Sequence, residues 1–103
     1  MRAVRLSLTA QRLFQTMLAQ GAMKFGVDVA DEKRRLVEDF IRGPLAEFPH
    51  RGYRDPGSKL HHYSISKTPF TVVYDYDSAE LRVLFIVHNR ADRRRLDPIA
   101  VEW

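Results

Sequence analysis

An arginine and a histidine interrupt a stretch of the chain that is otherwise apolar. The segment Leu81–His88 is rich in β-branched and aromatic residues, which predicts a strand. With regular alternation, Arg82 and His88 share one face of that strand. Six residues of strand span roughly 20 Å, so the two side chains cannot touch, but a groove along the strand could use both. The alternative is structural, with Arg82 paired to Asp75 or Asp77 near the end of the sheet.

Two further histidines could extend this chemistry. His61 and His62 are neighbours in a predicted strand, so they face opposite ways and cannot chelate one metal ion. If one of them faces the same groove as His88, the pair suits RNA cleavage: one imidazole accepts the 2′-hydroxyl proton, the other protonates the leaving oxygen, and a cation stabilises the phosphorane. The catalytic candidates for such a reaction are Arg82, His88 and one residue of the pair, His61 or His62, of which we name His61. The alternative is that these histidines are ordinary surface residues.

Basic residues gather after this strand and in a long loop before the histidine pair. The candidate binding residues, for a phosphate or for the acidic tail of a partner, are Arg54, Lys59, Arg90, Arg93 and Arg94. Nearby carboxylates partly offset their charge, so a solvated C-terminal turn is the alternative for the last three. The net charge of +4 permits an anionic partner without requiring one.

The chain lacks the residues of other common sites. It contains no cysteine, which excludes disulfides and thiolate chemistry, and it has no helical histidine pair, so we expect neither a metal nor a cofactor. No apolar run approaches the roughly 20 residues of a membrane span, and the N-terminus has no signal-peptide core. We expect a soluble cytoplasmic protein, with residues 1–103 forming a single domain.

The order of the predicted elements indicates an α+β fold. Alternating apolar residues predict a first strand at 4–8, and Thr9 is a good N-cap for the helix that follows. Gly26 ends this helix, Asp28 caps a second one, and Gly43-Pro44 ends or bends it. A loop at 49–58 precedes strands at 60–65, 70–76 and 81–88. The β-α-α-β-β-β order places a helical hairpin on one face of a small, mainly antiparallel four-stranded sheet.

The order and spacing of several motifs resemble the RelE/ParE superfamily, the toxin half of bacterial type II toxin–antitoxin pairs. The stretch Leu45-Ala-Glu-Phe-Pro-His-Arg-Gly52 is similar to the family's L-x-x-F-P-x-x-G exit from the second helix. The stretch from Leu81 to Arg93 looks like the hydrophobic strand with a His-x-x-x-Asp ending of ParE-like members. The resemblance covers nearly the whole chain, and each motif is weak alone.

The resemblance implies one of two activities. RelE-like members cut mRNA in the ribosomal A site with a cluster of lysine, arginine and often a C-terminal tyrosine or histidine, whereas ParE-like members lack the cluster and poison DNA gyrase. This chain has no tyrosine after Tyr76, and Lys59 and Lys67 do not form a dense basic strand. These departures favour the ParE-like branch, a toxin that binds gyrase and has no active site. On the RelE-like branch the chain is a ribosome-dependent endoribonuclease, and the catalytic candidates above become essential.

On either branch the resemblance implies a cognate antitoxin, whose acidic C-terminal segment wraps the helices and the sheet. It implies no direct sequence-specific DNA binding by this chain. A third hypothesis is a non-toxic partner-binding module, with Met17, Met23 and Trp103 at its interface. Whether residues 97–103 are ordered stays open, although Val101 and Trp103 suit packing back onto the sheet.

Overall fold

The computed structural model describes residues 1–103, and its elements follow the predicted order with one addition. The elements are β1 (Ala3–Leu6), α1 (Leu8–Phe25), α2 (Val27–Phe40), β2 (Tyr53–Arg54), β3 (His61–Ser64), β4 (Phe70–Tyr76) and β5 (Glu80–His88). A short 3-10 turn at Pro49–Arg51 precedes β2, and two more, at Arg93–Arg95 and Pro98–Ala100, follow β5. No helix combines the length and the apolar character that a membrane crossing requires.

The sheet has five strands in the order β1-β5-β4-β3-β2. The β1 strand runs parallel to β5, and the other neighbours are antiparallel. The prediction of four strands is one short, because two residues of the expected loop, Tyr53 and Arg54, pair with His62 and His61 and extend the sheet edge. A strand of two residues carries no alternation pattern, so the sequence could not reveal it.

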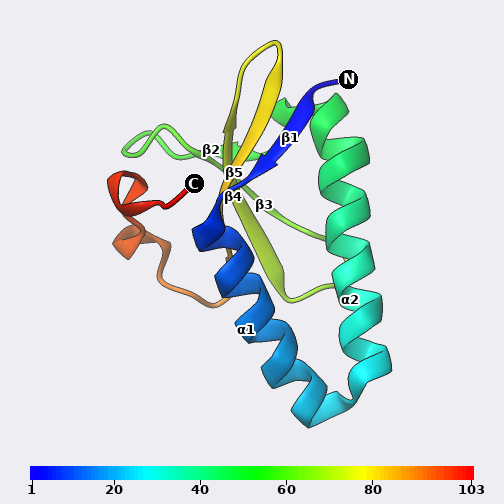
Figure 1. Cartoon of the computed structure of the whole chain (residues 1–103). Helices are drawn as coiled ribbons and strands as arrows, with labels where there is room; N and C mark the ends of the chain where they lie inside the picture. Colours follow the sequence, from blue (N-terminus) through cyan, green and yellow to red (C-terminus); the bar gives the residue numbers. More distant parts are fainter.

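Two layers of side chains cover the sheet. The helices α1 and α2 pack on one face, and the C-terminal segment crosses the other, as Figure 1 shows. The helix-side core includes Phe14 of α1, whose ring meets that of Phe70 edge-on with centroids 5.2 Å apart. The core on the opposite face is smaller and is completed by Leu96 and Val101. The helical hairpin on one sheet face is therefore confirmed.

The first helix begins earlier than predicted. Its N-cap is Ser7 rather than Thr9: the buried Ser7 hydroxyl accepts a hydrogen bond from the amide of Ala10 at 2.8 Å and donates one to the carbonyl of Leu84 at 2.7 Å. Both residues are good caps, and the tertiary bond to β5 decides between them. Gly26 ends α1 at a φ of 97° and also caps α2, so the predicted capping role of Asp28 is wrong.

The second helix loosens at its end instead of stopping at the glycine–proline pair. After Phe40 the chain makes a π-helical turn, Ile41–Leu45, that contains Pro44. Proline has no amide proton to donate to the preceding turn, and a wider turn accommodates it without ending the helical path. Ile41 and Leu45 are both buried, so the turn keeps its apolar side on the core.

The C-terminal residues are ordered and return to the start of α1. The amide of Leu8 donates to the carbonyl of Glu102 at 2.8 Å, and the Glu102 amide donates to the Thr9 hydroxyl at 2.9 Å. The Arg5 guanidinium lies over the Trp103 ring, 4.7 Å from its centroid. Val101 packs on the sheet as expected, and Trp103 lies against β1.

Candidate functional site

A β-bulge in β5 places Arg82 and His88 on opposite faces of the sheet. Val73 of β4 pairs with Phe85, but the next residue, Tyr74, pairs with Val83, so one residue of β5, Leu84, has no partner. The extra residue breaks the alternation, and Leu84 and Phe85 both pack on the face away from the helices. The predicted common face of Arg82 and His88 is therefore wrong, and with it the predicted groove that would use both.

The Arg82 side chain is held by three carboxylates at the start of β5. Its Nε donates to Asp75 at 2.6 Å, and its Nη1 donates to Asp77 at 2.9 Å and to Glu80 at 3.1 Å. The hydrogen bond from Arg82, together with those from two backbone amides, lowers the pKa of Asp77 to about 2. The structural alternative, an ion pair with Asp75 or Asp77, is confirmed.

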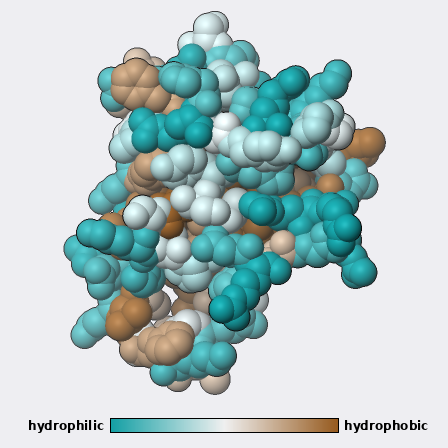
Figure 2. All heavy atoms as spheres, turned by 180° about the vertical axis from the view of Figure 1, so that it is seen from behind, coloured by the Kyte–Doolittle hydropathy of each residue, from teal (hydrophilic) through white to brown (hydrophobic).

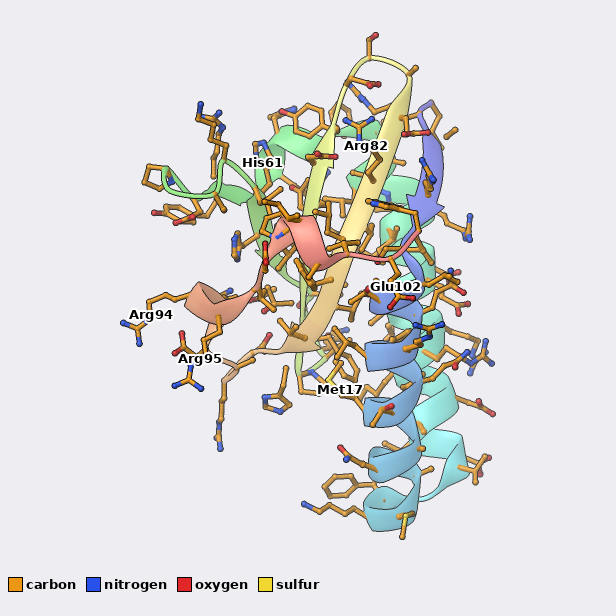
Figure 3. All side chains as sticks on the ribbon, turned by 60° about the vertical axis from the view of Figure 1, so that its left-hand side comes forward. Met17, His61, Arg82, Arg94, Arg95 and Glu102 are labelled. Atoms are coloured by element: carbon orange, nitrogen blue, oxygen red, sulfur yellow. The ribbon has the colours of Figure 1, made fainter.

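The two remaining candidates of the catalytic set lie on the helix side of the sheet. His61 stacks on the ring of Tyr74 with centroids 5.5 Å apart, and burial, followed by the charge of Arg54, lowers its pKa. His88 lies at the far end of β5, where its Nδ1 accepts a hydrogen bond from the amide of Arg90 at 3.1 Å. Figure 3 shows Arg82 at the upper end of β5, away from the arginines of the C-terminal turn. No hydrogen bond, ion pair or ring contact joins any two of the residues Arg82, His88 and His61.

A groove of about 830 Å³ opens on the face away from the helices. One wall is the β2–β3 edge with the loop between these strands, and the other is the turn that follows β5. Tyr53 and His62 stand side by side on the first wall because they are directly opposite each other in the antiparallel pair. Burial, followed by the charge of Arg93, lowers the pKa of His62.

The turn after β5 is organised by one carboxylate. Asp92 accepts a hydrogen bond from the amide of Arg94 and forms ion pairs with the guanidinium groups of Arg94 at 3.0 Å and Arg95 at 3.7 Å. The hydrogen bonds from the side chain and the amide of Arg94 lower the pKa of Asp92. Arg93 lines the groove and forms none of the ion pairs in the structure. Figure 3 shows Arg94 and Arg95 extending from this turn away from the sheet.

The structure brings together only part of the predicted binding set. Arg93 and Arg94 line the groove, whereas Arg54, Lys59 and Arg90 do not. Arg54 pairs with His61 at the edge of the sheet, and Lys59 occupies a tight turn at a φ of 64°. A binding role for these five residues stays a prediction.

Sequence reasoning missed Tyr53 of the first wall and left open whether His61 or His62 faces a groove. The alternation of His61 and His62 showed that only one of them could face a given groove, but not which one. That choice depends on the register of β3 against β4, where His62 pairs with Val73. Val73 belongs to the core away from the helices, so His62 shares that face.

A second groove, of about 460 Å³, lies between the helical hairpin and the end of the sheet. Its lining is mainly apolar and includes Met17, Phe25, Val29 and Phe70, with Lys24 and Lys33 also present. Phe25 and the neighbouring Met23 and Val27 are exposed at the hairpin tip. Figure 2, the view from behind, shows hydrophobic side chains gathered at this lower end of a mainly hydrophilic face.

No family model matches the sequence, and no curated protein matches it either. The structure is similar to a chain in a solved structure described as "Chromosomal ParDE TA system from P. aeruginosa". The match has a TM-score of 0.71 and 15% sequence identity, and it covers 85% of this chain and 96% of that chain. At this identity the similarity establishes the fold alone, and the predicted α+β class is confirmed.

Proposed function

We propose that this chain is the toxin of a type II toxin–antitoxin pair and inhibits growth by binding DNA gyrase. The observation that carries this proposal is the similarity of the fold, over 85% of the chain, to a chain of a ParDE system. The ParE-like branch is favoured over the RelE-like branch because the candidate catalytic residues do not converge. Arg82 is neutralised by carboxylates and faces away from His61 and His88. The proposed target is a cytoplasmic enzyme, so the chain acts in the cytoplasm.

The proposed partner is a cognate antitoxin with an acidic C-terminal segment. The groove between the hairpin and the sheet offers such a segment an apolar surface, and Lys24 and Lys33 supply positive charge beside it. Apolar anchors give affinity in this kind of binding, and complementary charge raises the association rate. This chain itself needs no sequence-specific contact with DNA.

The test is a supercoiling assay with the purified protein, purified gyrase and relaxed plasmid. We expect loss of supercoiling in proportion to the amount of protein added. The His88→Ala and His61→Ala variants should inhibit as well as the original chain, because a binding toxin needs no acid or base. A parallel translating extract separates the branches: cleaved mRNA with unaffected gyrase would establish the ribonuclease instead. Inactivity in both assays would leave the non-toxic binding module.

A further inference from the structure

The tip of the helical hairpin, residues 23–29, exposes apolar side chains that the core of the chain does not use. Met23 is 90% exposed, Phe25 70% and Val27 66%, around the single glycine that joins α1 to α2. Figure 1 shows that the hairpin extends beyond the lower end of the sheet, so its tip projects away from both core clusters. Contiguous apolar side chains left exposed in this way mark an interaction surface.

The tip lies directly beside the helix-side groove, the cavity of about 460 Å³ between the hairpin and the end of the sheet. Phe25 and Val29 of the tip line this groove together with Met17 and Phe70, which pack in the core of the chain. A projecting ring and an apolar hollow therefore adjoin each other at the same end of the molecule. Such a patch is complementary to itself, because a two-fold axis through it places the ring of each copy against the hollow of the other.

The charges at the tip also suit a second copy of this chain. Lys24 of α1 and the carboxylates of Asp28 and Glu32 of α2 are exposed, and none of them forms an ion pair within the chain. Asp28 and Glu32 are four residues apart, so they lie on the same side of the helix. Lys33, the other cation of the groove, donates to the carbonyl of Lys67 at 2.7 Å and has no carboxylate partner either. Two cations and two carboxylates are thus available for pairing across a two-fold axis.

The exposed apolar area sets the strength of such a pair. From their exposed fractions, the apolar side chains of the tip present roughly 500 Å² of surface on each copy. A symmetric pair that covers both tips buries roughly 1,000 Å² in total, at the lower end of the range for specific interfaces. An interface of this size forms a weak and reversible dimer, so monomer and dimer should interconvert with concentration.

We propose that the free chain forms a symmetric homodimer in which Phe25 of each copy enters the helix-side groove of the other, and Lys24 faces the carboxylates of the other tip. A closed pair of this kind covers both apolar patches at once and leaves no free patch for further chains. The dimer closes the groove that we assign to the antitoxin, so self-association and antitoxin binding exclude each other. This last consequence rests on the proposed function, whereas the dimer itself does not.

The test is sedimentation velocity ultracentrifugation of the purified chain at concentrations from about 1 μM to about 300 μM, the range in which a weak dimer forms. The mass should rise from 12.0 kDa toward twice that value. Phe25→Glu should weaken the association about tenfold or more, because it places a carboxylate in the apolar groove of the other copy. Ile99→Glu is the matched control, with an expected change below about twofold, because Ile99 is 93% exposed but lies outside the tip and the groove.

An exchange of charges tests the pairing across the axis. Lys24→Glu and Asp28→Lys should each weaken the dimer several-fold, because each single change sets like charges against each other. The double variant should recover most of that loss, since it restores the opposite signs in exchanged positions. A double variant as weak as the single ones would contradict this pairing. Circular dichroism checks that every variant keeps its fold.

The chain has no cysteine, so a single introduced cysteine gives a second readout. Val27→Cys at the tip should form a disulfide-linked pair under copper–phenanthroline oxidation several times faster than Ile99→Cys, and equal rates would contradict the proposal. A single-chain mass at every concentration, association that Phe25→Glu leaves intact, or growth beyond two chains would overturn it. Neither gyrase nor an antitoxin is present in these assays, so their outcome is separate from that of the proposed function.

Discussion

Gly52 lies where a side chain has no room unless its neighbours move. The Tyr74 hydroxyl donates to the carbonyl of Pro49 at 2.6 Å and crosses directly over this glycine. A Cβ at Gly52 would overlap the Tyr74 hydroxyl and lie 3.0 Å from the carbonyl of His62. Burial raises the pKa of Tyr74 to about 12, so the hydroxyl stays protonated and keeps this bond. Gly52, the last residue of the Leu45–Gly52 motif, therefore has a structural role: it makes room for the Tyr74 hydroxyl.

We therefore predict that Gly52→Ala lowers the free energy of unfolding by about 1–3 kcal/mol, because the ring or the chain must move. Urea unfolding followed by circular dichroism measures this change. Gly21→Ala is the control: nothing lies within 4 Å of the added Cβ, and alanine favours the helix, so its expected effect is a gain of about 0.5–1 kcal/mol. Equal stability of the two variants would contradict the close packing at Gly52.

Arg82 is the second residue with a definite expectation. Because it is held by three carboxylates, Arg82→Gln should lower the melting temperature by roughly 4–8 °C at low salt and by less at high salt. Gyrase inhibition at a permissive temperature should persist. A variant of unchanged stability that had lost its activity would instead show that Arg82 acts on a substrate.

At the element scale, the bulge of β5 and the cap of α1 form one unit. The Ser7 hydroxyl caps the helix and also donates to the carbonyl of the extra residue, Leu84. We predict that Ser7→Ala costs about 1–2 kcal/mol of stability, because it removes the cap and leaves a buried carbonyl without its donor. Chemical denaturation measures the loss, and Ser78→Ala in the exposed β4–β5 turn is the control, with little expected change. A neutral Ser7→Ala would mean that the bulge is held by other contacts.

The bulge also shows which features of the fold could be predicted from the sequence and which could not. Helical spacing and β-branched runs predicted both helices and the strands β1, β3, β4 and β5, because those patterns are local. The bulge at Leu84 depends on a partner far away in the chain, and no local pattern marks it. Because Leu84 is the extra residue of the bulge, Arg82 and His88 lie on opposite faces of the sheet. The predicted site was therefore wrong, although the strand that carries it was predicted correctly. Tyr53 was missed, and the choice between His61 and His62 stayed open, for the related reason that register is a property of two strands.

The two faces of the sheet carry different grooves. The helix side carries the apolar groove that we assign to an antitoxin, and the other side carries the polar groove with Arg93. We predict that Val29→Glu in the apolar groove weakens capture of the coexpressed cognate antitoxin about tenfold, because it places a negative charge where an acidic segment binds. Ile99→Glu, at an exposed site outside that groove, should leave capture unchanged in the same pull-down and titration. Equal losses would point to a different interface.

We propose that this chain is a growth-inhibiting toxin, and growth of a bacterial culture after induction of the chain without antitoxin tests this activity. We expect arrest within a few generations, and relief of the arrest when the cognate antitoxin is coexpressed. Val72→Asp, which places a charge in the fully buried core, should abolish the arrest because the fold is lost. Normal growth with the original chain accumulated in folded form would contradict the account.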